Sequence, residues 1–272
     1  MVITGANTGI GRTTAEHLAA RGAHVVLACR SQEKTEPVLA AIRQSDGSAA
    51  SVLLDLGDLA QVQRCAEEIL AMNRPIDVLL NNAGLAGPRG LTKDGFELAF
   101  GTNHLGHFLL TMRLAPRLSA ASRIVNVSSK AHYNAKGIDF DALRISTRSI
   151  TGLPEYGVSK LANVLFTKEL ARRLGPSGVR SYALHPGVVA SDVWRRIPWP
   201  LRTILKTRML SVEQGAQTSL YCATSPEVKD HDGRYYDDSR EKRPNPLAED
   251  VELARRLWAQ SVAWTGADLP AG

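Results

Sequence analysis

A tyrosine and a lysine lie four residues apart in "YGVSK", Tyr156 and Lys160. Four residues make about one turn of a helix, so the spacing predicts that both side chains share one helix face. A phenol with a pKa of about 10 exchanges protons poorly at neutral pH. A neighbouring ammonium favours the phenolate and lowers that pKa. The pair therefore suits proton transfer to or from a carbonyl or alcohol oxygen.

Other polar residues are expected to lie near this pair. "RIVNVSS" predicts a strand that ends in Ser128 and Ser129, and "NNAG", from Asn81 to Gly84, ends the preceding strand. Ligands of open α/β sheets bind at the carboxyl ends of the strands. Asn103 lies inside a predicted helix, where asparagine is disfavoured, which indicates another role. A capped kink or an exposed polar position is the alternative.

The segment "TGANTGIG", from Thr4 to Gly11, places three glycines between a strand and a helix. We expect Gly5 to take the backbone angle of a tight turn. Gly9 would let the backbone approach a pyrophosphate, and Gly11 would let helix and strand pack closely. The free N–H groups at the helix start would then face the phosphates. The alternative is a purely structural turn, but the surrounding βαβ pattern favours phosphate binding.

The second predicted strand ends in Cys29 and Arg30, and the next carboxylate is Glu33. Dinucleotide-binding chains often place an acid there to hold a ribose 2′-hydroxyl. Arginine instead suits a 2′-phosphate, because its forked donors are always charged. Arg12 could add a second positive charge. The pattern predicts NADP(H) over NAD(H), and the alternative is a surface arginine without a ligand.

Short apolar runs alternate with longer amphipathic runs along all 272 residues. This pattern predicts an α/β fold, a single-domain, Rossmann-like, doubly wound parallel sheet with helices on both faces. Residues 1–125 would mainly bind the cofactor, and residues 126–272 would carry catalysis and substrate binding. Gly22 and Gly175 are expected to end helices, and "SVEQ" from Ser211 predicts a capping box.

Composition excludes several classes of protein. Three scattered cysteines argue against a disulfide framework and fit a reducing compartment. No apolar run reaches the roughly 18 residues that a membrane span needs, and no leader pattern is present, so a cytoplasmic location is expected. The net charge of +6 fits a solvated surface, or an anionic cofactor, substrate or lipid surface. Neither nucleic-acid motifs nor metal-ligand spacings are found.

In their order along residues 4–187, these motifs and "HPG" resemble the short-chain dehydrogenase/reductase family. The segments "NHLGHFLLT" and "SKLANVLFTKELARRL" resemble the retinol dehydrogenase branch of this family, whose members generally prefer NADP(H). The resemblance implies that Tyr156 is the general acid/base and that Lys160 lowers its pKa and holds the nicotinamide ribose. It also implies that Ser129 hydrogen-bonds the substrate oxygen and that Asn103 holds a relay water.

The resemblance also implies a cofactor site without a metal. Asp55 would contact the adenine, Asn81 the adenosine ribose, and Ser191 the carboxamide. The full set of expected cofactor contacts is Gly5, Asn7, Thr8, Gly9, Ile10, Gly11, Arg12, Arg30, Asp55, Leu56, Asn81, Ala83, Gly84, Tyr156, Lys160, Pro186, Gly187, Val189 and Ser191.

The substrate side is expected in residues 191–210, a bent and basic segment in which Trp194 and Trp199 would contact a lipophilic substrate. A helix that simply packs on the body is the alternative. The basic residues could also meet an acidic membrane surface, which makes peripheral membrane contact possible. Residues 130–154 are expected at the rim, with His132 as an exposed loop histidine rather than a substrate contact.

Predicted helices at 97–115 and 156–174 carry more small and apolar residues than one buried face needs. Relatives often pair these helices, so a homodimer or tetramer is expected. The predicted activity is an NADP(H)-dependent carbonyl reductase or alcohol dehydrogenase. The alternatives are an NAD-dependent hydroxysteroid-type dehydrogenase and a non-catalytic nucleotide sensor. The presence of Ser129, Tyr156 and Lys160 together argues against a sensor.

Overall fold

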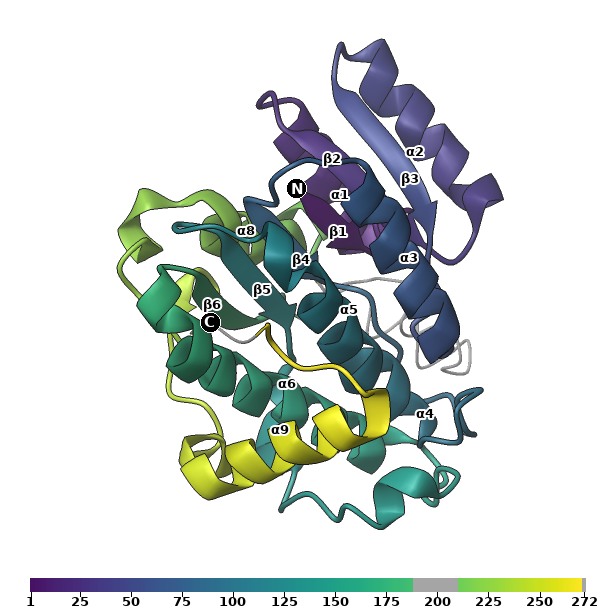
Figure 1. Cartoon of the computed structure of the whole chain (residues 1–272), viewed down its shortest axis with the longest axis vertical. Coiled ribbons are helices and arrows are strands. Elements are labelled where there is room, and N and C mark those ends of the chain that lie inside the picture. Colours follow the sequence, from purple (N-terminus) through teal and green to yellow (C-terminus); the bar gives the residue numbers. More distant parts are fainter. Residues whose placement is uncertain (188–209, 271–272) are drawn as a thin grey trace.

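The structure is a computed structural model that describes residues 1–187 and 210–270 (Figure 1). Its centre is one sheet in the order β3-β2-β1-β4-β5-β6-β7-β8. All neighbouring strands pair in parallel except β7 and β8. The strands are β1 Val2–Thr4, β2 His24–Cys29, β3 Ser48–Leu53, β4 Val78–Asn81, β5 Arg123–Val127, β6 Arg180–His185, β7 Arg234–Asp237 and β8 Arg240–Glu241.

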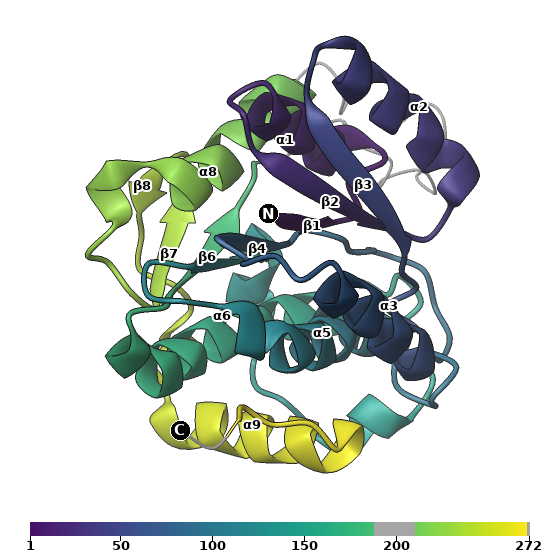
Figure 2. The same ribbon diagram turned by 45° about the horizontal axis from the view of Figure 1, so that its top comes forward.

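Helices cover both faces of this sheet, which confirms the doubly wound fold (Figure 2). The helices are α1 Gly9–Ala19, α2 Gln32–Gln44, α3 Leu59–Ala71, α4 Leu98–Phe100, α5 Gly106–Leu114, α6 Leu153–Leu174, α8 Val212–Thr224 and α9 Val251–Thr265. Successive strand residues point to opposite faces, so Val2 joins the core beneath α3 and α5, whereas Ile3 joins the core beneath α1 and α8. Both faces are buried, which explains the continuous apolar runs of the strands.

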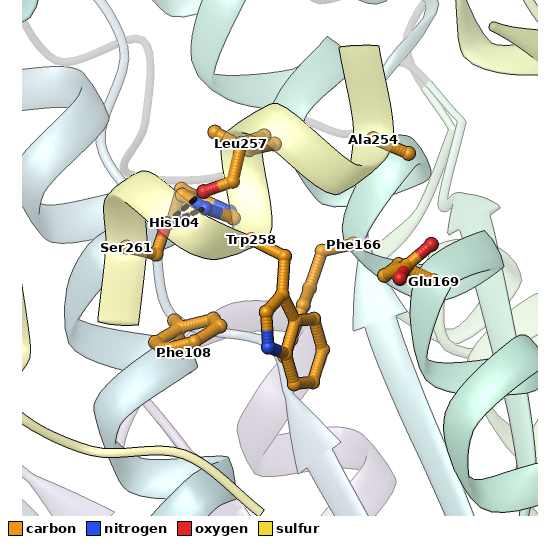
Figure 3. Close-up of a pocket in the computed structure, with 8 residues that line it drawn as sticks. All are labelled: His104, Phe108, Phe166, Glu169, Ala254, Leu257, Trp258 and Ser261. Atoms are coloured by element: carbon orange, nitrogen blue, oxygen red, sulfur yellow. Dashed lines mark hydrogen bonds between the residues drawn. The ribbon is translucent and has the colours of Figure 1, made fainter. Parts of the chain in front are cut away.

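Helix α9 forms an outer layer against α5 and α6 (Figures 2 and 3). The ring centroid of Trp258 lies 5.1 Å from that of Phe108 and 5.8 Å from that of Phe166. The Arg173 guanidinium lies 4.4 Å from the Trp258 ring. Part of the apolar surplus that suggested oligomerisation is therefore buried within the chain. The homo-oligomer stays a prediction, and its interface would have to use parts of α5 and α6 that α9 does not cover.

The helix expected at 97–115 is interrupted by a π-helical turn, Gly101–Leu105, between α4 and α5. Close packing accompanies the interruption. A Cβ atom on Gly106 would lie 2.5 Å from the Leu56 carbonyl oxygen, and one on Gly101 would lie 2.4 Å from a Thr92 methyl carbon. Asn103 is at the centre of this turn. Such turns inside helices are frequent at functional sites.

Several predicted helix ends are confirmed. Gly22 follows α1 with φ +86°, and Gly175 is the residue after α6. Ser211 and Gln214 form both hydrogen bonds of the predicted capping box at the start of α8. Helix α6 starts at Leu153, before the tyrosine motif, because Pro154 is tolerated in a first turn. Among the described residues, no helix is long and apolar enough to cross a membrane.

Candidate active site

The glycine loop lies at the carboxyl end of β1, beside the end of β4. Gly5 and Gly9 have φ of +65° and +53°, values that L side chains rarely adopt. A Cβ atom on Gly11 would lie 2.4 Å from the Gly5 carbonyl oxygen, as close helix–strand packing requires. Helix α1 begins without a side-chain cap on Thr8 and without an acid in its first turn. Its first amides therefore suit the pyrophosphate of a dinucleotide.

A buried hydrogen-bond chain ties the glycine loop to its neighbours. The Thr4 hydroxyl oxygen accepts bonds from the backbone N–H groups of Asn82 and Ala83, both at 2.9 Å. The same hydroxyl lies 2.9 Å from His107 Nε2, and His107 Nδ1 donates to the Asn103 carbonyl at 3.0 Å. Neither Thr4 nor His107 was among the predicted site residues. The four-residue spacing of Asn103 and His107 on one helix is the signal that could have found the histidine.

Asn103 is fully buried and holds the loop after β4. Its Oδ1 accepts from the Leu85 amide at 2.9 Å, and its Nδ2 donates to the Leu85 carbonyl and to the Ser159 hydroxyl. A Cβ atom on Gly84 would lie 3.2 Å from Asn103 Oδ1 and 3.3 Å from Lys160 Nζ. The alternative of an exposed polar position is therefore wrong for Asn103. The assignment of a relay water to this residue stays a prediction.

The side chain of Asn81 faces the protein interior. Its side chain is buried, and Nδ2 donates to Thr111 Oγ1 at 3.1 Å and to Asn126 Oδ1 at 2.8 Å. These partners belong to α5 and β5, so the amide points into the core beneath the sheet rather than to its edge. Asn82 has the other orientation, and its Nδ2 donates to the Thr4 carbonyl at 2.8 Å. The Asn81 side chain therefore joins strand to helix, and the ribose contact of this residue stays a prediction.

The predicted catalytic residues converge at the carboxyl end of β5. Ser129 follows this strand, and Tyr156 and Lys160 lie in the first two turns of α6. Lys160 Nζ donates to the Val127 carbonyl at 2.9 Å and lies 5.6 Å from the centre of the Tyr156 ring. This arrangement brings an alcohol, a phenol and an amine together where ligands of open α/β sheets bind.

Burial dominates the electrostatics of these groups. Burial raises the pKa of Tyr156, and a hydrogen bond with Ser129 works in the opposite direction. Burial also lowers the pKa of Lys160 to about 7. The phenol is therefore protonated at neutral pH, and the lysine titrates in the physiological range. Both shifts follow from the cost of placing a charge where little water reaches it.

The residues expected near the adenosine end also lie at this sheet edge. Arg30 is exposed after β2, and no acidic side chain of residues 1–187 and 210–270 pairs with it. Arg12 is exposed too, but its Nε pairs with Glu16 Oε1 at 2.8 Å. Asp55 Oδ1 accepts from the Gly57 amide at 2.9 Å, and Leu56 is buried. Among residues 1–187 and 210–270, Arg30 thus has no carboxylate partner, whereas Arg12 has one.

Other expected contacts divide into described and undescribed residues. Asn7, Ile10 and Ala83 are partly buried at the glycine loop and the loop after β4. Pro186 and Gly187 follow β6 at the same edge, and Gly187 has φ +88°. The remaining expected contacts, Val189, Ser191, Trp194 and Trp199, lie outside the described residues, as does nearly all of the segment 191–210.

The prediction for His132 was wrong, because this side chain is completely buried. It lies in a short 3-10 helix, Lys130–Asn134, directly after Ser129. Its Nδ1 donates to the Ser129 carbonyl at 2.6 Å. Its burial depends on residues more than 100 positions later in the chain, which contact it through Asn245. The local sequence shows only a polar loop, so burial could not be expected.

Comparisons with known proteins show which family the chain resembles. A family model described as enoyl-(acyl carrier protein) reductase matches residues 5–212. Human retinol dehydrogenase 13 is 45% identical over 283 residues, which cover 99% of this chain and 85% of the relative.

Solved structures share the fold. An uncharacterised protein from Mycobacterium paratuberculosis has a TM-score of 0.81 and 36% identity, with 99% of this chain and 94% of that chain covered. A protein described as an NAD(P)-dependent gluconate 5-dehydrogenase from Beutenbergia cavernae, with bound NADP, has a TM-score of 0.69 and 26% identity, with 87% and 93% covered.

Fold, site and relatives define an oxidoreductase that binds a nicotinamide cofactor. The chain belongs to the short-chain dehydrogenase/reductase family, and it is similar to the retinol dehydrogenases of that family.

Proposed function

We propose that this chain is an NADP(H)-dependent oxidoreductase that interconverts a lipophilic aldehyde or ketone and its alcohol. The convergence of Ser129, Tyr156 and Lys160, at the same sheet edge as the uncapped start of α1, carries the proposal. The names of the retinol dehydrogenases describe action on a lipophilic alcohol, which supports the substrate class. An NAD-dependent hydroxysteroid-type dehydrogenase remains the alternative.

Tyr156, Ser129 and Lys160 have different roles in the proposed proton transfer. Tyr156 keeps its proton at neutral pH, so it can protonate the oxygen of a carbonyl that is being reduced. The Ser129 side chain lies close enough to Tyr156 to lower its pKa, so its hydroxyl can orient the same oxygen. A charged Lys160 favours the phenolate that forms when Tyr156 releases its proton. Bound NADPH would supply the hydride in this direction.

The preference for NADP(H) is proposed from Arg30. Its exposed guanidinium follows β2 and lies at the edge of the sheet where the adenosine ribose is expected. A 2′-phosphate would offer this cation a charge-assisted hydrogen bond worth about 1.5–3 kcal/mol. The solved relative with bound NADP supports the same cofactor.

Arg30→Asp should change the cofactor preference, because it replaces attraction by repulsion at the 2′-phosphate. We expect the ratio of kcat/KM for NADPH to that for NADH to fall roughly tenfold or more. Arg21→Asp makes the same change of charge at an exposed position after α1, and it should leave the ratio unchanged. Equal ratios in the wild type and Arg30→Asp would refute the assignment.

A screen of NADPH consumption tests the activity itself. The panel should contain retinal, medium-chain aldehydes, steroids and quinones, each also measured with NADH. We expect turnover with at least one lipophilic carbonyl and a preference for NADPH. Turnover of steroids with NADH alone would favour the alternative, and no turnover of any carbonyl would contradict the proposal.

Location in the cytoplasm and peripheral membrane contact stay predictions.

A further inference from the structure

The peptide group between Ser129 and Lys130 is held from both sides by buried histidines. Its carbonyl oxygen accepts a bond from His132 Nδ1 at 2.6 Å and another from the His132 backbone amide at 3.0 Å. Its N–H donates to His185 Nδ1 at the longer distance of 3.4 Å. His185 ends β6, the strand next to the one that carries Ser129. Two neighbouring strand ends thus meet at this one peptide group.

His132 is itself held by Asn245, a residue 113 positions later in the chain. Its Nε2 accepts the Asn245 backbone N–H at 3.0 Å, and Asn245 Nδ2 donates to the His132 carbonyl at 2.8 Å and to the Ala135 carbonyl at 3.0 Å. An acceptor at Nε2 and a donor at Nδ1 define one neutral tautomer. The Tyr235 ring packs 4.8 Å from the imidazole. The ring therefore has one orientation and one protonation pattern.

The consequence concerns the Ser129 hydroxyl. Ser129 has an extended backbone, φ −165° and ψ 157°, and its hydroxyl accepts from the Ala131 amide at 3.2 Å. The Ser129 side chain also lies close enough to Tyr156 to lower the pKa of the phenol. Rotation of the peptide that follows Ser129 would move the first turn of the 3-10 helix and with it the Ala131 amide. The hydroxyl would then lose the geometry that a reacting oxygen requires, and small misplacements of this kind are costly.

We propose that His132 is a positioning residue for the reaction, whose Nδ1–H orients the Ser129 peptide and thereby the Ser129 hydroxyl toward Tyr156. Asn245 keeps His132 in the required tautomer, so a segment after β8 supports the catalytic serine. The role in turnover rests on the proposed function. The hydrogen bonds that fix the peptide group between Ser129 and Lys130 do not depend on the proposed function.

Two substitutions separate this role from plain structural support. An asparagine amide nitrogen can take the place of His132 Nδ1, and a glutamine amide oxygen can take the place of Nε2. His132→Asn therefore keeps the donor to Ser129 and leaves the Asn245 amide without its acceptor. His132→Gln keeps the acceptor for Asn245 and leaves the Ser129 carbonyl without the side-chain donor.

We expect opposite responses from the two variants. His132→Gln should lower kcat roughly 10- to 100-fold, with the Kd for NADPH and the Tm close to wild type. His132→Asn should keep kcat within about threefold of wild type while its Tm falls, because a buried amide has lost its partner. His231 lies just before β7, and its Nδ1 is hydrogen-bonded to the Tyr236 hydroxyl. His231→Gln replaces this histidine in the same way and serves as the control, for which we expect an unchanged kcat.

The proposal is wrong if His132→Gln keeps its kcat, or if kcat falls in both variants in proportion to Tm. Hydrogen exchange at the Lys130 amide, resolved by NMR, supplies a readout without substrate. It should accelerate in His132→Gln and not in His132→Asn. If the wild type turns over no carbonyl, the proposed function fails, and the exchange result alone decides the role of His132: equal exchange rates in the two variants would refute it.

Discussion

Tyr156→Phe is expected to lower kcat for carbonyl reduction by roughly 10²- to 10⁴-fold, the usual contribution of a positioned general acid. The substitution removes one hydroxyl and keeps the ring that packs at the start of α6. Because burial keeps the phenol protonated at neutral pH, this hydroxyl is the acid that the site offers to a reacting oxygen. The Kd for NADPH and the Tm should therefore stay close to wild type. The measurement is kcat with the best carbonyl from the screen, together with Kd and Tm.

A matched variant controls for the loss of a tyrosine hydroxyl. Tyr221→Phe removes a hydroxyl on α8 that donates to Glu227 Oε2 at 2.9 Å, away from the proposed site. Its turnover should equal that of the wild type. Retained turnover in Tyr156→Phe would show that another group supplies the proton. A loss of kcat that is accompanied by weak NADPH binding and a low Tm would instead indicate a damaged fold.

The free energy of unfolding is expected to fall steeply as the pH drops from about 6.5 toward 4. Burial lowers the pKa of His104 to about 3 and the pKa values of His107 and His185 to about 4. Between those values and the ordinary value near 6.5, the unfolded chain binds protons that the folded chain does not, so stability rises with pH in this window. At pH 5 the three histidines together lower the free energy of unfolding by about 6 kcal/mol, which is a large part of the free energy of unfolding of a typical protein.

Urea titrations at pH 7.5, 6 and 5 measure this effect. His104→Gln removes one of these three histidines and should reduce their joint contribution to the pH dependence by about one third, whatever it does to stability at pH 7.5. The exposed His17 provides the control, since His17→Gln should leave the pH dependence as in the wild type. Equal free energies of unfolding at pH 7.5 and pH 5 would show that these side chains are not buried as neutral imidazoles.

The sequence by itself determined the features that depend on short spacings. The alternation of apolar and amphipathic runs defined the doubly wound sheet, because strand and helix periods differ. The three glycines marked a tight turn and a close helix start, and both are present at Gly5 and Gly11. Tyr156 and Lys160 lie on adjacent turns of α6 because four residues make about one turn. The strand ends then placed Ser129 beside them, since parallel strands end at one edge.

The tertiary structure decided what depends on orientation and on distant contacts. Asn81 and Asn82 are adjacent, but alternation along β4 sends one amide into the core and the other to β1. The π turn around Asn103 accompanies the close approach of Gly106 to Leu56, 50 positions earlier in the chain. His132 is buried because Asn245 and Tyr235 reach it from beyond α8. Local patterns report the preferences of neighbouring residues, whereas these contacts exist only after segments far apart in the chain have packed together.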